Sequence, residues 1–155
     1  MGQLYVFGGY DGYAYLASAE CFNPFSSEWY ILPSMPSARS GCAAAVVSGH
    51  ICVIGGARVR DSLAVVESFD TFHGVWESLP DMPRARTSCA AAAVRGNLFV
   101  VGGDSGTEHL AEVESLRSPS ASWETVSPMP TPRHGCAAAA LRGLLFVFGG
   151  YDGTR

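Results

Sequence analysis

Short apolar runs separated by Gly, Pro and polar turns extend along the whole chain. Between residues 39 and 83, such runs occupy residues 42–47, 51–54, 63–69 and 76–79. Each run has the length of a β-strand, and Gly49, the Gly55-Gly56 pair and Pro80 interrupt the sequence between or after them. The pattern predicts four short antiparallel strands, with a polar loop between the second and the third, and an all-β fold.

This unit recurs every 47 residues, the step from Gly8 to Gly55. The same step relates four sets: the pairs Gly8-Gly9, Gly55-Gly56, Gly102-Gly103 and Gly149-Gly150; Trp29, Trp76 and Trp123; Glu20, Glu67 and Glu114; and Arg39, Arg86 and Arg133. Four strands in a repeat of this length describe a β-propeller blade. We expect one domain over residues 1–155, with a partial blade at 3–36, full repeats at 39–83 and 86–130, and a partial blade at 133–155.

Each repeat also carries an Ala-rich run after Cys42, Cys89 or Cys136. Ala favours helices, but these runs are too short for a stable helix and Gly residues bound them. Small side chains suit the innermost strand of a blade, which lies next to the crowded axis. We therefore expect strands here, with the three Cys as small thiols beside the axis.

The repeated polar and aromatic residues are expected to hold the scaffold together. The Gly-Gly pairs release the chain from the second strand, and the Trp residues pack between blades. The Glu residues stand one per blade, too far apart for acid–base pairs, and are expected to make structural hydrogen bonds. The Arg guanidinium groups can satisfy loop carbonyls at a blade junction, although direct ligand contact stays open for them.

Composition and charge narrow the classes of partner. The net charge is −4, which offers no basic field for nucleic acid, and no apolar run is long enough for a membrane span. The five Cys have neither a disulfide spacing nor the paired spacing of a zinc site, so we expect no metal and no cofactor. A reducing compartment is the default, the cytoplasm or alternatively the nucleus.

The ordered features of the repeat resemble those of the kelch family. They are residues 4–9 with their terminal Gly-Gly, then Tyr10-Asp11-Gly12, residues 19–24, Trp29, and Met35-Pro36 followed by Arg39. These repeats most resemble the kelch domains of adaptor proteins that also carry BTB and BACK domains. Because kelch rings usually contain about six blades, the resemblance implies a partial propeller of about three blades. Two copies would supply a full ring, so self-association is an expectation.

In kelch adaptors, peptide ligands bind the loops on one face of the ring. Carried onto this chain, the resemblance implies contacts from residues after Gly-Gly, from positions further along the same loop, and from residues after the repeated Arg. The first group is Tyr10, Ala57, Asp104 and Tyr151; the second is Tyr15, Ser62 and His109, with Arg58 and Arg60 nearby; the third is Ser40, Thr87 and His134. Arg58 and Arg60 predict an acidic or phosphorylated partner segment.

Three classes of function remain in view. The leading one is a protein-interaction module, such as the substrate-recognition part of a ubiquitin-ligase adaptor. An actin-binding or structural scaffold built from kelch repeats is the alternative. An oxidase with a copper site, known among kelch-like propellers, fits less well because no convergent Tyr, His and Cys cluster can be recognised in the sequence. We expect no enzymatic activity.

Overall fold

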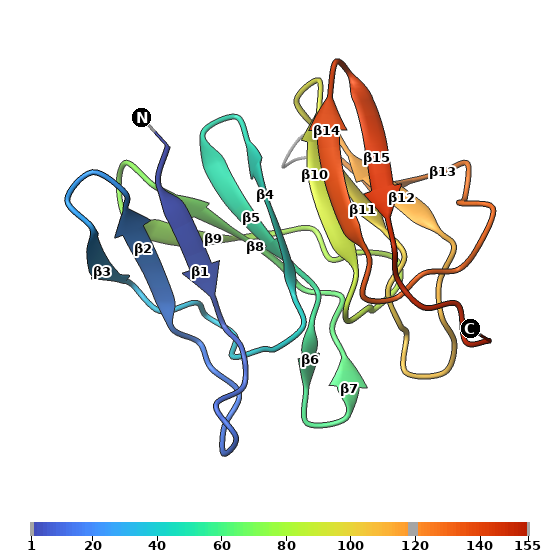
Figure 1. The fold of residues 1–155 in the computed structure, drawn as a ribbon, viewed down its shortest axis with the longest axis horizontal. Coiled ribbons are helices and arrows are strands. Elements are labelled where there is room, and N and C mark those ends of the chain that lie inside the picture. The colour runs from blue at the N-terminus through green and yellow to red at the C-terminus, as the bar shows by residue number, and fades with distance from the viewer. Residues whose placement is uncertain (1, 118–120, 155) are drawn as a thin grey trace.

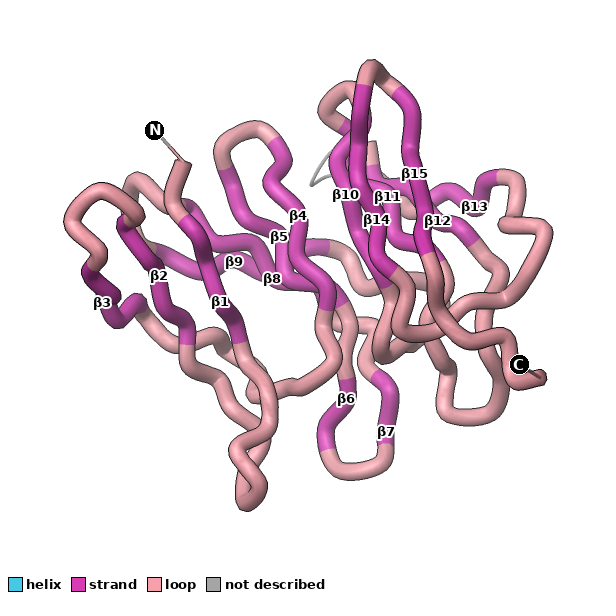
Figure 2. The backbone as a smooth tube through the Cα atoms, in the orientation of Figure 1, coloured by secondary structure: helices cyan, strands magenta, loops and turns pink. Residues whose placement is uncertain are grey.

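The computed structural model describes residues 2–117 and 121–154, which fold into antiparallel sheets (Figures 1 and 2). No helix forms within these residues, so the described part of the chain has no helix that could cross a membrane. Four sheets, blades 1 to 4 in chain order, stand side by side from the N-terminal to the C-terminal end, and they do not close into a ring (Figure 1). The expected all-β, partial propeller fold is confirmed.

Blades 2 and 3 contain four strands each, whereas blade 1 contains three and blade 4 contains two. Blade 1 is formed by β1 (Leu4–Phe7), β2 (Ala19–Asn23) and β3 (Glu28–Leu32). Blade 2 is formed by β4 (Ala43–Val47), β5 (His50–Ile54), β8 (Val66–Asp70) and β9 (Val75–Leu79). Blade 3 is formed by β10 (Ala90–Val94), β11 (Asn97–Val101), β12 (Val113–Leu116) and β13 (Glu124–Val126), and blade 4 by β14 (Ala137–Leu141) and β15 (Leu144–Phe148).

The Ala-rich runs form strands, as expected. Strand β10 lies between β4 and β14 along the inner edge of the arc. A tight turn with two residues of positive φ connects each of these strands to the next one, for example Ser48 (φ 51°) and Gly49 (φ 85°) after β4. Two such residues are the signature of the tight hairpin turn that matches strand twist, and the second of them favours Gly.

Two local expectations differ from the structure. The polar loop after Gly55-Gly56 contains its own small hairpin, β6 (Ala57–Arg58) and β7 (Asp61–Ser62). The third strand of blade 2 begins at Val66 rather than at Leu63. Leu63 stays outside the strand because its N–H donates to the Gly56 carbonyl and its own carbonyl accepts from the Arg86 N–H. These bonds tie it to the loop and to the start of blade 3.

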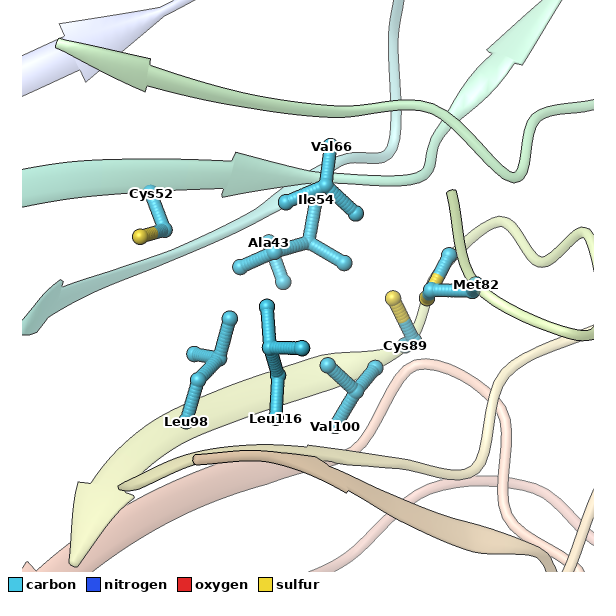
Figure 3. Close-up of a cluster of buried hydrophobic side chains, with 9 residues drawn as sticks. All are labelled: Ala43, Cys52, Ile54, Val66, Met82, Cys89, Leu98, Val100 and Leu116. Atoms are coloured by element: carbon cyan, nitrogen blue, oxygen red, sulfur yellow. The ribbon is translucent and has the colours of Figure 1, made fainter. Parts of the chain in front are cut away.

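The hydrophobic core lies between blades rather than within any one sheet. One cluster joins blades 2 and 3, and Figure 3 shows Ile54 and Val66 facing Leu116 and Val100 across that interface. A second cluster, which includes Val101 and Ala90, joins blades 3 and 4. Each blade therefore depends on its neighbour to bury its apolar faces.

The repeated Trp side chains bridge neighbouring blades where a neighbour is present. Trp76 Nε1 donates to the Pro33 carbonyl of the preceding blade at 2.9 Å, and the Trp76 ring packs edge-on against Phe7. Trp123 Nε1 donates in the same way to the Pro80 carbonyl at 2.8 Å. Trp29 of blade 1 faces the open end of the arc and is 53% exposed.

Candidate partner-binding face

The loops that follow the Gly-Gly pairs gather on one side of the arc, which we call the loop face; it lies at the bottom of Figure 1, where β6 and β7 project. The opposite side carries the tight turns at residues 48–49, 95–96 and 142–143 and is called the hairpin face. At Gly55 (φ 60°), an added Cβ would collide with the carbonyl oxygen of Arg86. The close approach of two backbones at this point therefore requires Gly and fixes where the loop begins.

A buried ion pair underlies the loop face in each complete blade. Arg39 and Glu67 pair at 2.8 Å between Nη2 and Oε2, and Arg86 and Glu114 pair at 2.9 Å between the same atoms. Arg39 Nη1 also donates to the carbonyls of Gly55 and Val65, each at 3.1 Å. The guanidinium thus contacts loop carbonyls, and in addition a Glu partner that sequence reasoning did not assign to it.

Burial and charge act in opposite directions on the paired carboxylates. Burial raises the pKa of the Glu114 carboxyl, and the Arg86 guanidinium beside it opposes this rise. An unpaired carboxylate in such a place would take up a proton, so the Arg is what allows it to stay charged. The pair anchors the strand β12 to the segment that leads into β10.

Backbone bridges bring two of the sequence-predicted groups together on the loop face. The residue after each repeated Arg pairs with the residue after Gly-Gly. These bridges are Ser40 with Ala57, Thr87 with Asp104, and His134 with Tyr151. Tyr10 instead pairs with Tyr15 within its own loop, and their rings lie 5.2 Å apart.

The loop positions Tyr15, Ser62 and His109 each reach toward the next blade. The Tyr15 hydroxyl donates to the Val59 carbonyl at 2.8 Å, and the Ser62 hydroxyl donates to the Asp104 carbonyl at 3.0 Å. The His109 ring stacks on His134, with centroids 4.4 Å apart. These side chains link successive loops into one continuous face.

Asp104 and the two His form a cluster at the boundary of blades 3 and 4. His109 Nδ1 lies 2.7 Å from Asp104 Oδ2, and Tyr151 contacts both imidazole rings edge-on, with centroids 5.6 Å apart. Asp104 Oδ1 accepts from the Gly106 N–H at 2.6 Å. Sequence reasoning found no such set because the residues occupy different repeat positions.

Arg58 and Arg60 flank the tip of the β6–β7 hairpin, and both are exposed. Between them Val59 has a positive φ of 61°, which a β-branched residue rarely adopts, and its side chain is 71% exposed. The bond from Tyr15 to its carbonyl helps to hold this conformation. Asp61 stands opposite Arg58 in the hairpin register, yet within the described residues no ion pair engages either Arg.

The acidic residues of the neighbouring loops already have partners. Arg84 forms ion pairs with Glu108 and, at 2.6 Å, with Glu112, and this ion-pair network was not expected from the sequence. The Asp11 carboxylate accepts from two N–H groups of its own loop, which lower its pKa. In the loop of blade 2, the β6–β7 hairpin carries Arg58, Arg60 and the carboxylate of Asp61, which leaves it an excess of positive charge.

The cysteines do not form a reactive or metal-binding centre in the part of the chain that the structure describes. All five are free thiols, and no cluster of three metal-ligating side chains occurs among residues 2–117 and 121–154. Burial raises the pKa of the Cys89 thiol to about 12 and also raises that of Cys42. Thiols with raised pKa values are poor nucleophiles at neutral pH.

Comparison with known proteins agrees with this architecture. The family model described as KLHDC2/KLHL20/DRC7 Kelch-repeats domain matches residues 1–150. Kelch-like protein 35 of Homo sapiens is 46% identical over 57 residues, which cover 37% of this chain and 10% of that protein. Kelch-like protein 15 of Danio rerio is 41% identical over 63 residues, 36% of this chain and 10% of that protein.

A third relative, the human protein named Influenza virus NS1A-binding protein, is 36% identical over 56 residues, 36% of this chain and 9% of that protein. The chain spans about a tenth of the length of these curated relatives. The family match covers nearly all of the chain and agrees with the 47-residue repeat, the Gly-Gly pairs and the four-stranded blades. The chain belongs to the kelch-repeat family.

Proposed function

We propose that the loop face recognises an acidic or phosphorylated segment of a partner protein, with the Arg58–Arg60 hairpin as its main contact. Kelch repeats support a protein-interaction module, and one relative carries the name of a protein it binds. The observation that carries the proposal is the charge balance of the face. Glu108, Glu112 and Asp104 of the neighbouring loop face Arg84 or His109, whereas Arg58 and Arg60 have no ion-pair partner within the described residues and outnumber Asp61 in their hairpin.

The shape of the hairpin fits this role. A strained residue at an exposed tip is typical of functional sites, and Val59 places an apolar side chain between two guanidinium groups. Arg can bind a carboxylate or phosphate with two parallel hydrogen bonds, which Lys cannot do. Ser40 and Thr87, at the bases of the neighbouring bridges, offer hydroxyl groups to the flanks of the segment.

The experiment is a charge reversal on each face of the arc. Arg58→Glu with Arg60→Glu should remove binding to an array of acidic and phosphorylated peptides, and raised salt should weaken binding by the unchanged chain. Arg95→Glu with Arg142→Glu makes the same change of charge in the turns of the hairpin face and is the matched control. Equal binding by both double variants would contradict the proposed site, provided that their melting temperatures match that of the original chain.

The resemblance to kelch-type ubiquitin-ligase adaptors supports a more specific function, in which the partner that binds the loop face is a substrate of the ligase. Five free thiols fit a reducing compartment, so we place this function in the cytoplasm, with the nucleus as the alternative. Recovery of the acidic partner with a ligase from cells, lost on reversal of Arg58 and Arg60, would support this role. Recovery with actin alone would favour the scaffold alternative.

We also propose that the isolated chain self-associates through its open ends. Among the described residues, Arg133 beside blade 4 has no Glu partner and the exposed Glu20 of blade 1 has no Arg partner, so each carries one half of the ion pair seen in the complete blades. A second copy supplies the missing half at each end.

Sedimentation of the 155-residue chain should therefore show a dimer. Arg133→Glu alone should weaken the dimer, and adding Glu20→Arg should restore it by exchanging the two charges. A monomer at all concentrations, or a double variant no better than the single one, would contradict this arrangement.

A further inference from the structure

The interface between blades 2 and 3 contains a cavity of about 240 Å³ that opens toward the hairpin face. Its walls are largely apolar, with one buried hydroxyl. The lining side chains that matter here are Val47, Cys52, Ser68, Leu79, Leu98 and Leu116. In Figure 3, Cys52 stands apart from Ile54 and Ala43, across from Leu98, at the end of the cluster where the space lies.

A recess of about 530 Å³ occurs at the equivalent interface of blades 1 and 2, where Tyr5 and Phe69 form part of its wall, so the two interfaces differ in the side chains that line them. At the position of Cys52, the other blades carry aromatic side chains: Tyr5 in blade 1, Phe99 in blade 3 and Phe146 in blade 4. At the position of Leu116, blades 1 and 2 carry Phe22 and Phe69. Two aromatic rings have thus been replaced by smaller side chains, Cys52 and Leu116, and both replacements line the same cavity.

The side chain of Tyr5 shows how a ring would sit there. Its hydroxyl donates to the Gln3 side-chain oxygen at 2.8 Å, and the residue equivalent to Gln3 in blade 2 is His50. His50 lines the rim of the cavity, and its imidazole lies 3.8 Å from the Asp70 carboxylate. A phenol ring placed as Tyr5 is placed would therefore bring its hydroxyl next to the His50 ring.

We propose that this cavity is a binding site for a small phenol, whose ring takes the space of the missing aromatic side chain and whose hydroxyl bonds to His50. An apolar cavity of about 150 Å³ left by a truncated side chain is known to bind benzene, so 240 Å³ has room for a ring with one substituent. The buried Ser68 hydroxyl and the Arg117 and Glu77 side chains at the mouth add polar groups near the substituent.

The probe is p-cresol, which is the side chain of Tyr without its backbone, and toluene is the same molecule without the hydroxyl. Titration of the 155-residue chain, followed by amide NMR shifts, should show saturable binding of p-cresol at Cys52, Ser68 and Leu98. Toluene should bind about three- to tenfold more weakly, the value of one hydrogen bond. His50→Ala should weaken p-cresol by a similar factor and leave toluene unchanged.

Filling the cavity provides the decisive variants. Cys52→Tyr and Leu116→Phe introduce the residues that blades 1 and 2 carry at these positions, and each should lower the affinity for p-cresol at least tenfold while raising the melting temperature. Cys52→Ser keeps the cavity and should keep the affinity within about twofold. The proposal is wrong if p-cresol shows no saturable binding to the folded chain, or if it binds the filled variants as well as the original.

Discussion

Blades 2 and 3 complete the contacts of the repeat, whereas blades 1 and 4 hold separate halves of them. In blade 3, Arg86 and Glu114 pair while both are buried. Arg133 of blade 4 retains a bond to the Gly149 carbonyl, at 2.5 Å, but has no carboxylate partner in the described residues. The difference shows that Arg at this repeat position forms a stabilising ion pair only where the later strands of its blade are present, because one of those strands carries the Glu partner.

The largest effect is expected from breaking the buried pair. Arg86→Ala should lower the free energy of unfolding by about 3–5 kcal/mol, because it leaves the Glu114 carboxylate buried without a counter-charge. Arg133→Ala, at the same repeat position, should cost about 1 kcal/mol or less, since it loses little beyond one carbonyl contact. Urea unfolding of both variants measures the contrast.

A double variant separates charge burial from packing. Arg86→Met with Glu114→Leu removes both charges and keeps apolar volume, so it should recover most of the stability that Arg86→Ala loses. If Arg86→Ala and Arg133→Ala prove equally destabilising, the contrast between complete and incomplete blades does not hold at this position.

The next effect concerns the bridging aromatic residues. Trp76→Ala should cost about 2–3 kcal/mol, because the half-buried ring contacts Phe7 and Phe69 and its Nε1 bonds to the Pro33 carbonyl. Trp29→Ala should cost less than about 1 kcal/mol, because that ring faces the open end and packs on Phe22 alone among the described aromatic residues. Thermal unfolding at a concentration where the chain is monomeric compares the two.

The sequence was sufficient for the scaffold because its information is local and periodic. Strand length, the Gly-Gly pairs and the 47-residue step predicted the blades. It did not predict the β6–β7 hairpin, since residues 57–62 lack the Gly or Asn that such a turn usually contains and Val59 adopts a positive φ against its own preference. The backbone there is determined by tertiary contacts such as the bond from Tyr15.

The sequence also did not predict which repeat positions contact each other. Periodicity shows that Arg39 and Glu67 recur, but it does not show which recurring residue faces which. The same two positions pair through the backbone in blades 1 and 2, as Tyr10 with Tyr15 and Ala57 with Ser62, but the side-chain contact of Asp104 with His109 does not recur, so nothing in the repeat marked it. Of the candidate binding face, the sequence could therefore predict the loops involved but not the links between them.

The smallest expected effect compares equivalent turns in blades 1 and 2. Asp70 ends β8, and its carboxylate accepts from the Phe72 N–H at 2.8 Å and lies 2.6 Å from His73 Nδ1. The bond to His73, together with the backbone N–H groups, lowers the pKa of Asp70 to about 2. Asn23, the equivalent residue of blade 1, makes the corresponding bond to the Phe25 N–H without a charge. Asp70→Asn should therefore retain the turn and lose the charge-assisted part of its stability.

The sign of the pH dependence follows from that lowered pKa. The folded carboxyl holds its proton less tightly than the unfolded one, whose pKa is about 3.9, so the ionised Asp70 stabilises the fold above that pH. This contribution should fade as the pH drops from about 4 toward 2. The stability difference between the original chain and Asp70→Asn should thus be constant at pH 5 to 6 and shrink under more acidic conditions. NMR titration of the Asp70 side chain checks the cause directly, and a midpoint near the ordinary value of about 3.9 would show that the exposed turn gains nothing from its charge.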